Sequence, residues 1–284
     1  MSRHAPPLSH QATKLVSNYL DKSRTRGSET IERRIGDATR FAEFVDKTYH
    51  LEHIENLKPG HIESFIKDMQ ERGLSNSTAA NYMTTIRIIA NQIGKQNIVE
   101  RENSAYGISR AGERLNPITA NAEKISELRE QLYERGEWLG LAHDLRQEFG
   151  LRAAESIQWH GDVITHPDGS QSLHIDRKDG SKGGRPRDIP IRTEQQKELI
   201  NKVQNYIRSN GQRSLMPKNL SRQQAYNVQK NTIHSLGATR ESAANMHALR
   251  HAYAQDRAQA TDRQTVAEEL GHGRSDVVSH YVSR

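Results

Sequence analysis

Residues 172–191 read SLHIDRKDGSKGGRPRDIPI and decide the fold class of the chain. Leu173 and Ile175 alternate with polar residues on one side of a tip rich in Gly, Lys and Arg, and Ile189 and Ile191 do so on the other. Because a period of two is typical of a strand, this stretch predicts a β-hairpin with a long loop. Apolar residues recur at helical spacing on both sides of the hairpin. We therefore expect a mainly α-helical protein with a small β-hairpin or sheet.

The segments beside the hairpin predict that it belongs to an α+β domain. Helical patterns precede it at about residues 120–135 and 138–149. In FGLRAAESIQW, residues 149–159, Gly150 ends one helix, Ala153 begins the next, and Arg152 lies at the junction. The chain after the hairpin returns to helical patterns. We place this domain at residues 119–284.

The first hundred residues predict a separate all-helical domain. Apolar residues such as Ile31, Ile35 and Val45 fall at helical spacing, and Gly or Pro residues separate four helical segments. Residues 100–118 are charged, contain glycine and lack periodicity, as is typical of an interdomain linker. We expect a four-helix domain at residues 1–105 and a linker at 106–118.

The composition excludes several classes of protein. The 284 residues include no Cys, which rules out disulfides, thiolate metal sites and Cys nucleophiles. No apolar run approaches the roughly 20 residues that cross a bilayer, and the first residues lack the apolar stretch of a secretory signal, so we expect a cytoplasmic protein without membrane contact. The net charge of +6 suits a polyanionic partner, although a basic surface exposed to solvent is an equally simple explanation.

The stretch MHALRHAYAQ, residues 246–255, gathers His247, Arg250 and His251 on one face of a predicted helix. The two histidines have the i, i+4 spacing of a metalloprotease zinc helix. However, position 248 is Ala where the catalytic Glu would stand, and no third ligand lies nearby in the sequence, so we expect no metal. Burial for structural reasons would account for a single histidine, but it accounts less well for three polar groups on one helical face.

Two further segments carry groups that could act on a phosphate. Five of the twelve residues 176–187 are Lys or Arg, which suits either a solvated turn or a loop that contacts phosphates. VAEELGHGRSDVVSHYVSR, residues 266–284, predicts a helix that ends at Gly271, then His272, then a second helix carrying Tyr281. Taken alone, a tyrosine near the end of a chain is usually a packing or surface residue.

Together these motifs resemble the tyrosine recombinase (phage integrase) family, in particular its two-domain, Xer-like or integrative-element members. GLRAAES resembles the family's first motif and aligns its arginine and acidic residue with Arg152 and Glu155. SKGGRPRDIPI resembles the hairpin with the active-site lysine, which falls on Lys182. HALRH, and LGH followed nine residues later by Tyr, resemble the remaining motifs. The first domain resembles the SAM-like core-binding domain, most clearly at STAANYMTTIR.

The resemblance implies an enzyme that cuts and rejoins DNA strands through a 3′-phosphotyrosyl intermediate, without a metal or other cofactor. Tyr281 would be the nucleophile, and a hairpin lysine would protonate the leaving 5′ oxygen, Lys182 first and Lys178 as the alternative. The other implied catalytic positions are Arg152, His247, Arg250 and His272. Arginines suit the charge of the transition state, because guanidinium groups bind phosphate oxygens in bidentate fashion.

Other residues have supporting roles in this interpretation. Glu155 would support a neighbouring His or Arg, and His251 would hold its helix in place. The candidate contacts to DNA phosphates are Lys178, Arg185 and Arg187. Double-stranded DNA is the expected partner, with assembly to a tetramer on paired sites, a monomer in free solution, and a nucleoid-associated location.

Several alternatives remain open at the level of sequence. An integrase of a mobile element and a resolving recombinase of a chromosome or plasmid would use the same residues. A type IB topoisomerase shares the chemistry, and a DNA-binding regulator could use the same scaffold without catalysis. Only three residues follow Tyr281, where many relatives continue into a segment that docks on a neighbouring protomer, so we expect a chain that ends short or has been shortened. The sequence does not disclose the DNA site.

Overall fold

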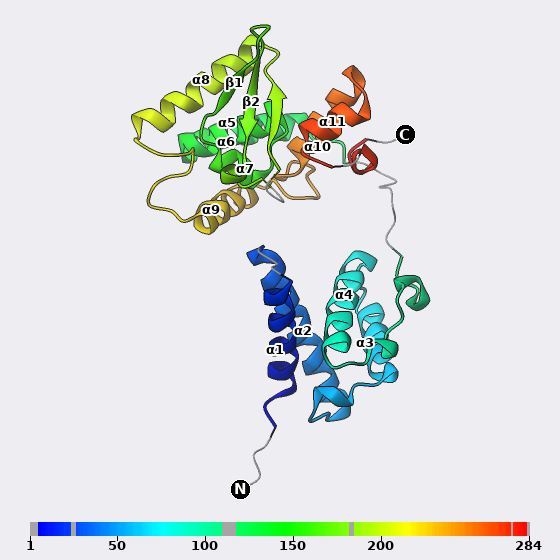
Figure 1. Cartoon of the computed structure of the whole chain (residues 1–284). Coiled ribbons are helices and arrows are strands. Elements are labelled where there is room, and N and C mark those ends of the chain that lie inside the picture. The colour runs from blue at the N-terminus through cyan, green and yellow to red at the C-terminus, as the bar shows by residue number, and fades with distance from the viewer. Residues whose placement is uncertain (1–4, 24–26, 110–117, 182–184, 274, 283–284) are drawn as a thin grey trace. The chain divides into compact units, whose positions relative to one another are not determined.

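The computed structural model of the chain describes residues 5–23, 27–109, 118–181, 185–273 and 275–282 (Figure 1). The chain divides into two compact units, Met1–Gly112 and Glu113–Arg284, each with its own hydrophobic core. The division falls within residues 106–118, where the sequence suggests a linker. Helix dominates both units, and a small sheet belongs to the second, as the sequence predicts.

The first unit contains the four predicted helices, and its aromatic residues meet at the centre. The Phe65 ring lies 5.2 Å from the rings of Phe41 and Phe44 and 5.4 Å from that of Tyr82. Local signals set the helix ends, because the Ser75 side chain accepts a hydrogen bond from the Thr78 amide at the start of the fourth helix. The helices are α1 (Leu8–Lys22), α2 (Ser28–Tyr49), α3 (Pro59–Glu71) and α4 (Asn76–Gln92), with short 3₁₀ helices at Ile54–Asn56, Gln96–Ile98 and Asn103–Tyr106.

In the second unit, seven α-helices of the described ranges surround a three-stranded sheet (Figure 1). The helices are α5 (Ala122–Arg135), α6 (Glu137–Phe149), α7 (Ala153–Gln158), α8 (Glu194–Ser209), α9 (Arg222–Ser235), α10 (Ala248–Ala260) and α11 (Arg263–Glu269). The strands are β1 (Val163–Thr165), β2 (Gln171–Ile175) and β3 (Arg187–Pro190), and 3₁₀ helices occupy Arg177–Asp179 and Ser275–His280 (η6).

The predicted hairpin is confirmed, and a third strand extends it. Strands β2 and β3 pair antiparallel with Leu173 opposite Ile189, and both side chains are buried. Strand β1 pairs antiparallel with β2 on its other edge. Sequence periodicity does not reveal β1 because three residues are too few to show an alternation.

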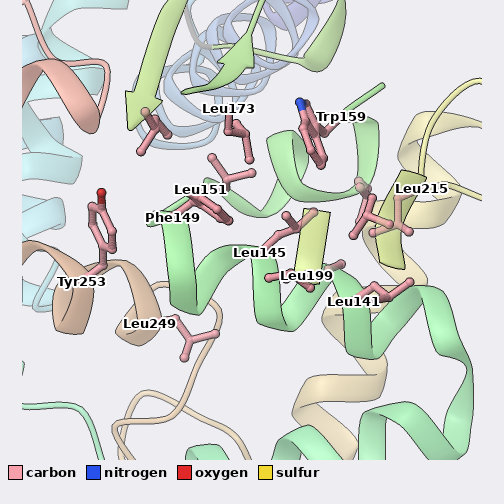
Figure 2. Packing of buried hydrophobic residues seen from close by; sticks show 14 of the residues in the cluster. Leu141, Leu145, Phe149, Leu151, Trp159, Leu173, Leu199, Leu215, Leu249 and Tyr253 are labelled. Atoms are coloured by element: carbon pink, nitrogen blue, oxygen red, sulfur yellow. The ribbon is translucent and has the colours of Figure 1, made fainter. Parts of the chain in front are cut away.

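Helix α6 runs through the core of the second unit. Leu141, Leu145 and Phe149 lie on one line along it and meet Trp159 and Leu173 from the segments that follow (Figure 2). The helix ends at Gly150, which has a φ of +61°. A side chain there would begin 2.4 Å from the Tyr253 ring of α10, so the position requires glycine both for its backbone and for this close approach.

The end of the chain differs from the predicted second helix. The segment after His272 forms the 3₁₀ helix η6, and Tyr281 follows it directly, with its amide donating to the Val278 carbonyl at 2.9 Å. A 3₁₀ helix rises about 2.0 Å per residue, against about 1.5 Å in an α-helix, so a short segment reaches further. This segment delivers Tyr281 to α10, where its ring lies 4.7 Å from the ring of His251. Within the described ranges, no helix is both long enough and apolar enough to span a bilayer.

Replacing Gly150 by alanine should destabilise the second unit more than the same change at Gly169. Both glycines have positive φ, so each alanine costs about 1 to 2 kcal/mol of backbone strain. Gly150→Ala also drives a methyl group into the Tyr253 ring, which adds about 1 to 3 kcal/mol. Gly169→Ala adds no such cost, since nothing lies within 4 Å of a side chain at Gly169. Chemical denaturation followed by circular dichroism measures both losses, and equal losses would contradict the packing argument.

Candidate active site

Arg250 is the best-fixed charged group of the site. Its side chain is 1% exposed and extends from the first turn of α10. Nη1 donates to the Gly150 carbonyl at 2.6 Å, and Nη2 donates to the Leu270 carbonyl. Burial and the nearby charge of Arg152 lower the pKa of Arg250 to about 10, so it stays protonated at neutral pH. The fold therefore holds a full positive charge in a fixed orientation.

The carbonyls that bind Arg250 belong to the residues that cap the C-terminal ends of two helices. Gly150 caps α6, and Leu270 caps α11. The last carbonyls of a helix have no partner within the helix and carry part of its negative dipole, so both are suitable acceptors for a cation. Arg250 therefore ties two helix ends that are 120 residues apart in the sequence to α10.

Tyr281 lies against this guanidinium. Its hydroxyl is 3.5 Å from Nε of Arg250 and 3.3 Å from Nε2 of His272, and the residue is 6% exposed. The His272 and His247 rings have their centres 5.6 and 6.0 Å from the centre of the tyrosine ring. The structure thus brings α10, the turn after α11 and the end of the chain to one place.

A tight turn positions His272. Gly271 has a φ of +65°, and its amide donates to the Glu268 carbonyl at 2.8 Å. The His272 amide donates to the Ala267 carbonyl at 2.7 Å, which closes the end of α11. A side chain at Gly271 would approach Arg187 to about 3.0 Å, so this turn lies close to β3.

Glu155 holds two arginines at the start of α7. Its fully buried carboxylate accepts bonds from Nη1 of Arg152 at 2.7 Å and from both Nη atoms of Arg187, at 3.0 and 2.7 Å. It also accepts from the Arg152 amide at 2.8 Å. Burial alone would raise the pKa of Glu155, but Arg187 and Arg152 outweigh burial and lower it to about 2. The arrangement suits Glu155 as a support for Arg152.

Arg187, a candidate contact to DNA phosphates, lies inside the fold of the second unit. Besides Glu155, its guanidinium binds the Glu269 carbonyl through Nε at 2.9 Å, and the side chain is buried. Arg187 and Ile189 are two residues apart on β3 and both point into the fold, which explains why this basic residue of the tip does not face solvent.

Arg185 and Lys178, the other candidate phosphate contacts, are exposed. A side chain at Gly273 would lie 2.1 Å from Nη1 of Arg185, so that guanidinium lies beside the turn of His272. The Lys178 ammonium lies 2.5 Å from the Asp162 carboxylate, and this hydrogen bond raises the pKa of Lys178. Lys182, the candidate general acid, lies outside the described residues.

The two histidines of HALRH differ in burial. His251 is buried, and the centre of its ring lies 5.2 Å from that of His247 and 4.7 Å from that of Tyr281. His247 is exposed at the N-cap of α10. In the part of the chain that the structure describes, no group of three or more His, Cys, Asp or Glu side chains is placed to hold a metal ion.

Sequence reasoning missed the groups that position Arg250. The carbonyls of Gly150 and Leu270 carry no side-chain signal. Glu269 was also missed, although it is buried and bonded to Tyr253 and Arg257. One signal was available, because Glu269 falls three residues after Val266 on the apolar face of α11, where a carboxylate needs buried partners.

Two family models match the chain. Residues 107–256 match the family model described as Integrase, and residues 13–99 match the model described as Phage integrase, N-terminal. The chain belongs to the tyrosine recombinase (integrase) family. A comparison with curated proteins gave no match.

Solved structures of recombinases share the fold. The XerH site-specific recombinase bound to difH substrate, in a pre-cleavage complex, is 20% identical, with a TM-score of 0.64 over 96% of this chain and 81% of that one. A lambda integrase tetramer bound to a Holliday junction is 14% identical, with a TM-score of 0.67 over 99% and 81%. The Tn1549 transposon integrase in complex with transposon right end DNA is 14% identical, with a TM-score of 0.59 over 96% and 95%.

Glu155→Gln should lower the free energy of unfolding at pH 7 by about 3 to 5 kcal/mol, because it leaves the guanidinium groups of Arg187 and Arg152 without a counter-charge. The folded-state pKa of Glu155 lies near 2, below its ordinary 4.5, so the ionised carboxylate stabilises the fold above pH 4.5. This contribution is lost as the pH falls toward 2. The difference in unfolding free energy between the variant and the wild type should therefore shrink between pH 4.5 and pH 2.

The measurement is chemical denaturation at a series of pH values. Glu134→Gln is the matched control, since Glu134 is an exposed residue of the same unit and its loss should change stability by less than about 0.5 kcal/mol. A Glu155→Gln deficit that stays constant down to pH 2 would contradict the assignment.

Proposed function

We propose that this protein is a site-specific DNA recombinase that cuts and rejoins strands through a 3′-phosphotyrosyl intermediate on Tyr281. The contact of the Tyr281 hydroxyl with Nε of Arg250 and Nε2 of His272, at 3.5 and 3.3 Å, carries the proposal. Of the groups brought together here, a phenolic oxygen is the one suited to act as a nucleophile toward phosphorus. A phosphate bonded to that oxygen would lie beside a buried positive charge.

The proposed reaction conserves the energy of the phosphodiester. The Tyr281 oxygen attacks the scissile phosphorus, the new oxygen–phosphorus bond forms, and the bond from phosphorus to the 5′ oxygen breaks. The tyrosine proton passes to a base, for which His272 is best placed at 3.3 Å. The 5′ oxygen takes up a proton from a lysine of the hairpin loop. Rejoining reverses these steps, with a 5′ hydroxyl attacking the phosphotyrosine.

Arg250 and Arg152 would stabilise the extra negative charge of the transition state. Arg250 is already oriented by carbonyls, so little reorganisation is needed when a phosphate arrives. Arg152 uses one Nη atom for Glu155, and within the described residues its Nε and Nη2 make no hydrogen bond that would compete with a phosphate. His247, exposed at the N-cap of α10, would add a donor from the solvent side.

Double-stranded DNA is the proposed partner, and integration or excision of a mobile element is the proposed role. Membership of the integrase family, the net charge of +6 and the likeness to the Tn1549 transposon integrase support both. The likeness to a lambda integrase tetramer on a Holliday junction supports assembly to a tetramer on paired sites. Phosphate contacts by Lys and Arg side chains would make the affinity fall steeply with salt.

Tyr281→Phe should abolish covalent attachment to DNA. The test uses a nicked suicide duplex carrying a site selected from random DNA by binding to the full chain, and measures the denaturant-resistant protein–DNA adduct. Loss of one phenolic oxygen removes the nucleophile, while DNA affinity should stay within about twofold because that oxygen makes no phosphate contact before the reaction. Tyr206→Phe, a half-buried tyrosine of α8 outside the site, should react like the wild type.

Three results would contradict the proposal in different ways. An adduct that survives in Tyr281→Phe would place the nucleophile elsewhere. Specific binding by the wild type with no adduct would favour a regulator without catalysis. Relaxation of supercoils on DNA without a specific site would favour a topoisomerase.

Lys182→Ala should slow cleavage about 100-fold or more on ordinary DNA and much less on DNA with sulfur in place of the scissile 5′ oxygen. A thiolate leaves without a proton, so a missing general acid no longer matters. Lys178→Ala should stay within about threefold of the wild type on both substrates, because the bond to Asp162 raises the pKa of Lys178 and makes it a weaker acid. Single-turnover cleavage rates on the two substrates are the measurement. If Lys178→Ala is the slow variant and the sulfur substrate restores its rate, Lys178 is the general acid and Lys182 is not.

A further inference from the structure

A second buried carboxylate, Glu269, binds side chains from two parts of the second unit, helix α10 and the segment after β3. The Tyr253 hydroxyl donates to it at 2.7 Å, and Arg257 donates through Nε at 3.1 Å and Nη2 at 3.3 Å. Arg192, just after β3, donates through Nη2. Burial alone would raise the pKa of Glu269, but these partners hold it below its usual value, so the group is ionised at neutral pH.

Glu269 immediately precedes the residues that form the site. Its own carbonyl binds Nε of Arg187, and the next carbonyl, that of Leu270, binds Arg250. His272 follows two residues later. A shift of the Glu269 backbone would therefore move both an acceptor of Arg250 and the imidazole that faces Tyr281.

Tyr253 contacts Gly150 and the side chain of Glu269, the residue that precedes Leu270. Its ring fills the space beside Gly150, where an added side chain would begin 2.4 Å from the ring, and its hydroxyl binds Glu269. Figure 2 shows the side chain standing on α10 near the end of α6, with the hydroxyl at its far end. Tyr253 thus links the backbone at Gly150 to the side chain of Glu269, the residue before Leu270.

We propose that Tyr253 and Glu269 are positioning residues that set the two carbonyls around Arg250, and with them the alignment of Arg250, His272 and Tyr281 for attack on phosphorus. This inference rests on the proposed function. Neither residue touches the reacting atoms, so their effect is on geometry. A misplacement of about 1 Å in a reacting group can cost about 100-fold in rate, and loss of one strut should cost about tenfold.

The same unit contains a cluster of the same chemistry in another place. The Tyr133 hydroxyl donates to Asp144 at 2.8 Å, and Arg129 donates to the same carboxylate through Nε and Nη2 at 2.7 and 2.8 Å. The Tyr133 ring also packs against a glycine, Gly140, at a distance of 2.4 Å from an added side chain. This cluster joins α5 to α6 and has no contact with Arg250, so it is a matched control for structural effects.

The experiment compares Tyr253→Phe with Tyr133→Phe in the full chain. Both variants keep the ring and lose one hydrogen bond from a tyrosine to a carboxylate. Tyr253→Phe should slow single-turnover adduct formation on the suicide duplex about tenfold, with the DNA dissociation constant within about twofold of the wild type. Tyr133→Phe should leave both within about twofold, with a similar change in melting temperature.

Glu269→Gln and the double variant Tyr253→Phe, Glu269→Gln extend the test. If the two residues act as one strut, the double variant should be little slower than the slower single variant, since coupled residues are not additive. Equal rates for Tyr253→Phe and Tyr133→Phe, or fully additive losses in the double variant, would overturn the inference.

A second readout separates this inference from the proposed function. In free protein labelled with ¹⁵N-histidine, the His272 imidazole signals, assigned with His272→Gln, should move in Tyr253→Phe and stay in place in Tyr133→Phe. If the wild type forms no adduct, the proposed function fails, and these signals alone decide the inference. Unmoved His272 signals in Tyr253→Phe would overturn it, even if the wild type forms an adduct.

Discussion

The second unit depends on a buried guanidinium held by two helix ends. A charge as fully buried as that of Arg250 costs several kcal/mol unless it is compensated. The compensation comes from the carbonyls of Gly150 and Leu270, the residues that cap the C-terminal ends of α6 and α11, and not from a carboxylate bonded to it. If α6 or α11 moved relative to α10, Arg250 would lose a hydrogen-bond acceptor and its charge would be buried without compensation. The contacts that set the geometry of the site therefore also stabilise the fold.

Two other arginines near the site, Arg187, which is buried, and Arg257, which is partly buried, are paired differently. Arg187 gives two bonds to Glu155, and Arg257 gives two to Glu269, so a full negative charge lies against each. Those pairs fasten β3, α7, α10 and α11 together, while Arg250 is bonded to no carboxylate of the described residues. Arg152 is intermediate, because it shares Glu155 and keeps part of its guanidinium uncommitted. The bonding partners of Arg187, Arg257, Arg152 and Arg250 thus determine how much of each charge is neutralised within the fold.

Sequence predicted the parts of this arrangement that leave a local pattern. Alternation located the hairpin, and glycines marked the end of α6 and, within two residues, that of α11. The pattern failed where the deciding contact is long-range or involves the main chain. Arg187 looked like one more basic residue of a loop tip, yet it shares the inward face of β3 with Ile189. The carbonyls around Arg250 and the 3₁₀ helix before Tyr281 could not be deduced without the fold.

The use of helix ends instead of carboxylates has a chemical consequence. A carboxylate bonded to Arg250 would cancel its charge and compete with an incoming phosphate, which would have to displace it. A helix C-terminus carries only about half of an elementary charge, spread over several carbonyls, so it orients a guanidinium while leaving it a net cation. Gly150 and Gly271 both have positive φ. This conformation lets the backbone change direction at the end of α6 and just after the Leu270 carbonyl. The orientation of Arg250 therefore depends on Gly150 and Gly271, which shape the two turns that carry its acceptor carbonyls.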